Sequence, residues 1–226
     1  MAFEVSLSVD AIDDFTNDKQ ESTTVGSNII LIGATGSGKS TVGWLLARLI
    51  GYGFIDLDLM IEAREKKPVH EIFESQGESY FRGIESELIA SLAGIRSHVL
   101  ATGGGAVMED GSWEQLHAMG TVIWLNTPPE EIARRLMTNE AEMRKRPLLA
   151  ELLSHKDLEM RLKLLAERLS ALIGNRVGRY KQADLVVSDG FSTPESTARL
   201  LKETLVREGR LQLAQDQRPY DRWGIF

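Results

Sequence analysis

Short, mainly apolar runs alternate along the chain with longer segments in which apolar residues recur every three or four positions. The short runs have the length of strands and lie at 29–32, 54–55, 99–101, 121–125 and 184–188. The longer segments have helical spacing and lie at 41–50, 69–75, 78–93, 156–176 and 193–209. Strands that alternate with amphipathic helices are typical of a parallel sheet with helices on both faces. With 42% apolar residues among 226, we expect one three-layer α/β domain around a five-stranded parallel sheet.

The first apolar run leads directly into a glycine-rich stretch. Residues 33–40 read Gly-Ala-Thr-Gly-Ser-Gly-Lys-Ser and fit G-x-x-x-x-G-K-[ST], the pattern of a phosphate-binding P-loop. In such a loop the backbone amides and the next helix N-terminus attract phosphate oxygens. Lys39 then reaches the β- and γ-phosphates, and the Ser40 hydroxyl ligates Mg²⁺. A Gly/Ser turn that fits by chance is the alternative, but the strand before and the helix after favour a site for ATP and Mg²⁺.

Two carboxylates, Asp56 and Asp58, follow the second apolar run. In an extended segment, residues two apart point to the same side, and at the carboxyl edge of a parallel sheet that side is the ligand crevice. We therefore expect one carboxylate near Mg²⁺ and the other near a substrate hydroxyl. The alternative is that one of them caps a helix.

Three further segments each allow a structural and a functional interpretation. Arg82 and Glu85 lie three residues apart in a helix, either as a surface ion pair or as a cationic group that grips a carboxylate. Gly103–Gly105 follow a strand, either as a turn or as a place where the backbone approaches a ligand. The charged segment 138–150 is either a solvated connector or a mobile lid that brings Arg146 to the transferred phosphate.

The composition excludes several classes of protein and site. The chain has no cysteine, which excludes disulfides and thiolate chemistry, and Glu74 stands where H-E-x-x-H would need a second histidine after His70. The net charge of −7 argues against broad nucleic-acid affinity, and no apolar run approaches the ~20 residues of a membrane span. The N-terminus lacks the basic start of a signal peptide. We expect a cytoplasmic protein without nucleic-acid or membrane partners.

Taken in order, the motifs of residues 28–208 resemble those of the shikimate kinase family. After the P-loop, Phe54-Ile55-Asp56-Leu57-Asp58 is similar to the family's Asp-x-Asp, and Phe81-Arg82 with Glu85 to its shikimate-binding helices. Gly103-Gly104-Gly105 resembles the family's triple glycine, and Arg146-Pro147-Leu148-Leu149 its lid arginine motif. The resemblance implies a P-loop kinase fold with strand order 2-3-1-4-5 and a mobile lid. An acidic extension at 1–27 and a C-terminal tail at 209–226 lie outside it.

The resemblance also implies a role for each matched residue. The implied catalytic residues are Lys39, Asp58 and Arg146. The implied nucleotide contacts are Gly36, Ser37, Gly38, Lys39, Ser40, Thr41, Arg146 and Pro194. The implied shikimate contacts are Asp58, Arg82, Gly103, Gly104, Gly105 and Arg176. The implied metal contacts are Ser40 and Asp56, with ATP and Mg²⁺ as the cofactors.

The chain departs from the family pattern in its second half. Residues 176–180 have the spacing of Arg-x-Pro-x-Tyr but carry Gly178 in place of the proline, so Arg168 or Arg179 is an alternative to Arg176 as the second carboxylate-binding arginine. The lid segment is longer than in compact members, and Arg135 is the candidate for the arginine that stacks on adenine.

The implied reaction is transfer of the γ-phosphoryl of ATP to the 3-hydroxyl of shikimate, a step of chorismate and aromatic amino acid biosynthesis, by a protein expected to be a monomer. One alternative is a related small-molecule kinase such as a gluconate kinase, which would not need the set of Arg82, Gly103–Gly105 and Arg176. The other is a non-catalytic ligand sensor, although residues 1–27 are too short and too acidic for a DNA-binding module.

Overall fold

The computed structural model describes residues 27–138, 143, 157–188 and 193–211. At its centre lie five parallel strands in the order β2-β3-β1-β4-β5. The strands are β1 (Asn28–Ile32), β2 (Gly53–Asp56), β3 (His98–Ala101), β4 (Gly120–Leu125) and β5 (Leu185–Val187). The expected sheet and its strand order are confirmed.

Helices cover both faces of the sheet, and β1 shows why its sequence is apolar at every position. Ile29 and Leu31 pack against α2 (Lys39–Ile50) and α11 (Pro194–Arg207) on one face. Ile30 and Ile32 point to the other face, because successive side chains of a strand alternate. All four are at most 1% exposed, so β1 is the buried centre of the molecule.

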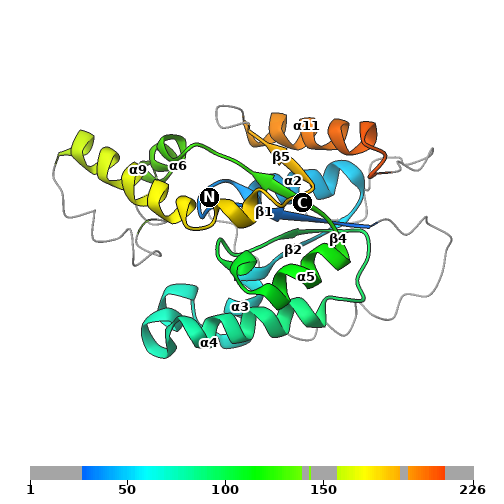
Figure 1. The fold of residues 1–226 in the computed structure, drawn as a ribbon, viewed down its shortest axis with the longest axis horizontal. Helices are drawn as coiled ribbons and strands as arrows, with labels where there is room; N and C mark the ends of the chain where they lie inside the picture. The colour runs from blue at the N-terminus through cyan, green and yellow to red at the C-terminus, as the bar shows by residue number, and fades with distance from the viewer. Residues whose placement is uncertain (1–26, 139–142, 144–156, 189–192, 212–226) are drawn as a thin grey trace, which may run out of the picture.

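The second face carries three helices and a short turn of 3₁₀ helix. They are α3 (Leu57–Glu65), α4 (Val69–Ser91), η1 (Ala106–Met108) and α5 (Asp110–Met119). Figure 1 shows α3 and α4 together beneath the sheet, with α5 between α4 and the strands. Ile61 of α3 packs with Ile72, Phe81 and Ile84 of α4 in a small core of their own.

The remaining helices lie beyond the carboxyl ends of the strands. The helices α6 (Pro129–Met137) and α9 (Leu158–Gly174) share a core that also contains Ala34 of the P-loop. In Figure 1 this pair lies to one side of the sheet, above α4. The four-residue helix α10 (Val177–Tyr180) returns the chain from α9 to the edge of the sheet.

The structure differs from the sequence-based expectation in two places, at Asp58 and at the helix α5. The segment around Asp58 is not extended, because Asp56 caps α3 and Asp58 lies in the first turn of that helix. The two helices expected at 69–75 and 78–93, in contrast, are confirmed, because α4 consists of two helical parts that meet at a kink at Gly77 (φ 84°, ψ 170°). The helix α5 was not predicted. Within the described residues, no helix is long and apolar enough to cross a membrane.

Candidate active site

The P-loop lies between β1 and α2, as its sequence predicts. Gly33, Gly36 and Gly38 have φ of 143°, 78° and 98°, a region that residues with a side chain rarely adopt. A Cβ at Gly33 would also lie 2.7 Å from the carbonyl oxygen of Leu125. These backbone conformations turn the loop around the space in front of the α2 N-terminus, the arrangement that binds phosphate.

Two polar groups of the loop indicate how it would meet an anion. Lys39 is 7% exposed, and its Nζ donates to the carbonyl oxygens of Gly33 and Ala34 at 2.9 Å each. The Ser37 hydroxyl is buried and has no hydrogen-bond partner among the described residues. Ser40 and Thr41, in contrast, are exposed in the first turn of α2. The loop therefore offers a buried hydroxyl and an ammonium group to phosphate oxygens.

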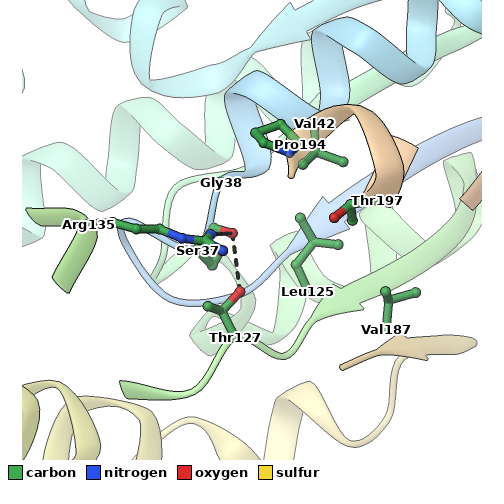
Figure 2. Close-up of a pocket in the computed structure, with 9 residues that line it drawn as sticks. All are labelled: Ser37, Gly38, Val42, Leu125, Thr127, Arg135, Val187, Pro194 and Thr197. Atoms are coloured by element: carbon green, nitrogen blue, oxygen red, sulfur yellow. Dashed lines mark hydrogen bonds between the residues drawn. The ribbon is translucent and has the colours of Figure 1, made fainter. Parts of the chain in front are cut away.

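A pocket beside the P-loop brings together residues from five segments of the chain (Figure 2). Arg135 of α6 lies on one side of it and Pro194 of α11 on the other. The guanidinium of Arg135 reaches the Ser37 carbonyl at 3.5 Å and Glu131 at 3.0 Å, and the Thr127 hydroxyl donates to the same carbonyl at 3.2 Å. Arg135 and Pro194, singled out from the sequence for an adenine-binding position, thus line one pocket.

The two aspartates occupy different environments. Oδ1 of Asp56 accepts hydrogen bonds from the backbone amides of Asp58 (3.0 Å) and Leu59 (3.2 Å), which is the helix-capping alternative. Burial raises the pKa of Asp58 to about 6, and the negative charge of Asp56 adds to this effect, while the positive charge of Lys39 opposes it. Asp58 is therefore within electrostatic range of the P-loop lysine and is a candidate proton acceptor near neutral pH.

Arg82 and Glu85 are not a surface ion pair. The Arg82 side chain is 15% exposed and the Glu85 side chain 2%, and Nη1 of Arg82 donates to Oε2 of Glu85 at 2.5 Å. The second guanidinium nitrogen, Nη2, lies 3.3 Å from the exposed Glu78. Burial raises the pKa of Glu85, although the charge of Arg82 partly offsets the effect. Oε1 of Glu85 has no hydrogen-bond partner among the described residues.

The glycines after β3 allow these side chains to approach the backbone. A Cβ at Gly103 would lie 2.5 Å from Oε1 of Glu85 and 2.9 Å from Oδ1 of Asp58. A Cβ at Gly105 would overlap the guanidinium of Arg82, which lies directly against that residue. The side chains of Asp58, Arg82 and Glu85 therefore meet against the backbone of Gly103–Gly105, which is a packed surface rather than a flexible turn.

Arg176, at the start of α10, reaches the same glycine segment. Nη1 of Arg176 donates to the carbonyl oxygen of Gly104 at 2.9 Å. Arg179 points elsewhere, since it pairs with Asp110 and lies over the ring of Trp113. Arg168 is exposed on α9. Of the three arginines considered from the sequence, Arg176 is the one whose hydrogen bond to the glycine segment the structure shows.

The sequence pattern contains both Tyr180 and Glu85 but does not show the contact of the first or the burial of the second. Tyr180 was noted as part of a pattern but given no role, and its hydroxyl donates to Gly104 at 2.7 Å. The burial of Glu85 was also missed, because the helix periodicity does not show that the glycine segment covers it. Arg146 and the lid segment around it lie outside the described residues. Among those that are described, no three or more acidic or histidine side chains cluster to hold a metal.

Comparisons with known proteins agree with this geometry. A model of the shikimate kinase family matches residues 35–205. The chain is 39% identical over 181 residues to a shikimate kinase of Thermosynechococcus vestitus (80% of this chain, 90% of the relative). It is 41% identical over 186 residues to one of Gloeobacter violaceus (81% and 97%). The solved structure of an Acinetobacter baumannii shikimate kinase in complex with shikimate has a TM-score of 0.70 and 30% identity, covering 81% of this chain and 94% of that one.

Proposed function

The chain belongs to the shikimate kinase family and phosphorylates shikimate with ATP, and from that premise we propose how its residues divide the reaction. The γ-phosphoryl group moves to the 3-hydroxyl of shikimate. The proton of that hydroxyl passes to Asp58, a new O–P bond forms, and the bond to the β-phosphate oxygen breaks to release ADP. The observation that carries this assignment is the convergence of Asp58, Arg82 and Arg176 on Gly103–Gly105, next to the P-loop.

The nucleotide occupies the P-loop end of the crevice. The buried Ser37 hydroxyl and the backbone amides of Gly36 and Gly38 bind the phosphates, and the adenine lies in the pocket between Arg135 and Pro194. Lys39 leaves the carbonyl groups of the loop and pairs with the β- and γ-phosphates, where its charge stabilises the transferred group.

Mg²⁺ fits the oxygen donors that flank the phosphate site. The Ser40 hydroxyl is exposed at the start of α2, and Asp56 uses Oδ1 for its cap, which leaves its other carboxylate oxygen for the ion or for its bound water. When bound, Mg²⁺ would neutralise charge on the β- and γ-phosphates. Arg146 of the lid segment is proposed to reach the same phosphates when the lid closes.

The acceptor occupies the other end. Arg82 and Arg176 form a carboxylate clamp, two guanidinium groups that together hold the carboxylate of shikimate, while Asp58 faces its hydroxyl groups. Glu85 keeps the Arg82 guanidinium in one orientation. Because Arg82 and Arg176 both lie against the glycine segment, the substrate is positioned by backbone as much as by side chains.

We further propose that the enzyme works as a monomer in the cytoplasm. The nucleotide pocket, Asp58 and the clamp all come from a single chain, which supports a monomeric active unit. Light scattering after gel filtration, with and without both substrates, measures the state directly.

Turnover of ATP against shikimate, quinate and gluconate, measured as ADP release, tests the proposed function. We expect activity with shikimate, because its ring hydroxyl can contact Asp58 while its carboxylate binds to the clamp, so that all the proposed contacts are made at once. Lys39→Ala should abolish turnover in a protein that still folds, since the charge of the lysine acts on the nucleotide. Turnover of gluconate in preference to shikimate would instead support the related-kinase alternative.

A further inference from the structure

The helix α10 carries a second residue that acts on the glycine segment. Tyr180 is 0% exposed, and its ring stacks on Trp124 of β4 with a centroid distance of 5.5 Å. Its hydroxyl extends beyond that stack and donates to the carbonyl oxygen of Gly104. The ring is thus part of the core, whereas the hydroxyl contacts the glycine segment.

Two donors converge on the same carbonyl. Gly104 accepts from Nη1 of Arg176 at 2.9 Å and from the Tyr180 hydroxyl at 2.7 Å. A carbonyl oxygen has two lone pairs, so both are used, and the peptide group cannot rotate without breaking a buried hydrogen bond. A Cβ at Gly104 would also lie 3.2 Å from the backbone nitrogen of Thr35, so the P-loop limits movement of this peptide from its other side.

The orientation of this peptide determines where the two arginines stand. Arg176 is tied to Gly104 by its hydrogen bond, and the guanidinium of Arg82 lies directly against Gly105, the next residue. The peptide between Gly104 and Gly105 is therefore the piece of backbone that separates the two guanidinium groups of the clamp. A carboxylate is held by two guanidinium groups only when their spacing matches its two oxygens.

The rest of α10 is anchored independently of the substrate. Arg179 pairs with Asp110 of α5 and lies over the ring of Trp113, with 5.4 Å from its guanidinium carbon to the ring centroid. These side-chain contacts connect α10 to α5, and Arg176 and Tyr180, one turn apart, present both donors to one oxygen. The anchor matters in this chain because Gly178 has a lower helix propensity than other residues and stabilises α10 less.

We propose that Tyr180 is a positioning residue for substrate recognition: its hydroxyl fixes the Gly104 carbonyl and thereby sets the spacing of Arg82 and Arg176 for the substrate carboxylate. The inference rests on the proposed carboxylate clamp. Burial raises the pKa of Tyr180, although Arg176 partly opposes the effect, so the hydroxyl keeps its proton near neutral pH and can donate it to the Gly104 carbonyl.

The variant that isolates this role is Tyr180→Phe, which keeps the stacked ring and removes only the hydroxyl. We expect KM for shikimate to rise about three- to tenfold, the range for loss of one buried hydrogen bond. We expect kcat and KM for ATP to stay within about twofold, because the hydroxyl bonds to the Gly104 carbonyl, beside the proposed clamp. Tyr52→Phe is the matched control, since that hydroxyl bonds with Ser97 on the far side of the sheet, and its kinetic constants should match those of the wild type.

A substrate variant and a double variant separate positioning of the clamp from a general structural effect. The carboxamide analogue of shikimate lacks the charge that the clamp holds, so Tyr180→Phe should lower kcat/KM for the amide by less than twofold. In an Arg176→Lys background, where the clamp is already broken, Tyr180→Phe should likewise have little further effect. Equal losses for acid and amide, additive losses with Arg176→Lys, or an unchanged KM for shikimate would each overturn the proposal. Failure of the wild type to phosphorylate shikimate would count against the proposed function instead.

Discussion

Asp58 and Glu85 are neighbouring carboxylates with different charged groups around them. Glu85 is almost completely buried but faces the guanidinium of Arg82, whereas Asp58 lies between charges of both signs. The positive groups near Asp58, Lys39 and Arg82, do not outweigh burial and the negative charges of Asp56 and Glu62. Asp58 therefore holds its proton more strongly than a free aspartate does, which suits its proposed role of accepting a proton from a hydroxyl.

The first prediction concerns the pH dependence that follows from Asp58. The folded-state pKa of about 6 is above the ordinary value of 3.8, so kcat/KM for shikimate should fall on the acid side of about pH 6, where the base becomes protonated. The same shift stabilises the folded state below about pH 4, and that contribution is lost as the pH rises through about 6.

Asp58→Asn should therefore raise the melting temperature above pH 6 and have no such benefit at pH 4. Glu74→Gln, which removes an exposed carboxylate from α4, is the control and should show no pH-dependent gain. An acid limb that persists unchanged in the residual activity of Asp58→Asn would show that another group titrates.

The second prediction concerns the geometry of the clamp. Arg82→Lys keeps a positive charge but loses the planar pair of donors, and it leaves the buried Glu85 with a poorer partner. We expect a loss of about 1.5–3 kcal/mol of shikimate binding, which is roughly a ten- to hundredfold rise in KM. ATP affinity should hardly change. Titrations of each ligand at saturation of the other measure both values, and an equal loss for the two ligands would contradict the assignment.

At the scale of elements, the strands were predictable and some helices were not. The strands are apolar on both faces of the sheet, and such a run can be recognised in the sequence without knowing which helices pack on it. The start of α3 is a different case, because the choice between an extended Asp56–Asp58 segment and a capped helix depends on where the side chain of Asp56 points. The helix α5 was missed because its residues 110–119 carry little amphipathic pattern apart from Trp113, Leu116 and Met119.

The third prediction compares two glycines that have the same free space but different backbone conformations. A Cβ at Gly77 or at Gly178 would meet no atom within 4 Å. Gly77, however, has φ of 84° at the kink of α4, whereas Gly178 is helical within α10. Gly178→Ala should therefore stabilise by about 0.5–1 kcal/mol, while Gly77→Ala should destabilise by about 1–3 kcal/mol.

Thermal melts of the two variants should shift in opposite directions, by a few degrees each for a chain of this length. Gly178→Ala should also leave KM for shikimate unchanged or lower it, because a stiffer α10 keeps Arg176 in place. A shift of the same sign in both variants would mean that free space, and not the backbone conformation, decides the outcome.

At the scale of the whole molecule, the candidate site is a meeting of segments far apart in sequence. The motifs at 33–40, 56–58 and 103–105 are readable because each is short and its chemistry is local. The contacts between Gly104, Arg176 and Tyr180 join positions more than 70 residues apart, and no pattern within either segment records them. The short motifs therefore predict which segments come together at the candidate site better than they predict which residues hold those segments in place.

The last prediction concerns the packing of Leu211, which follows α11, against the layer formed by α2 and α11. Leu211 follows α11, is 4% exposed and packs in the core with Leu46, Ile50 and Leu205, to whose carbonyl its amide donates at 3.1 Å. Leu211→Ala should therefore lower the free energy of unfolding by about 2–5 kcal/mol, as for other buried leucines. Leu200→Ala, on the same layer but at a leucine that is 42% exposed, is the matched control and should change it by less than about 1 kcal/mol.

Denaturant titration measures both changes, and the kinetic constants for ATP and shikimate should be unaffected in either variant, because the active site lies at the opposite end of α2. A loss for Leu211→Ala no larger than that for Leu200→Ala would show that the layer is complete without Leu211. A large loss with intact kinetics would instead show that residues beyond α11 belong to the core that holds the P-loop helix in place.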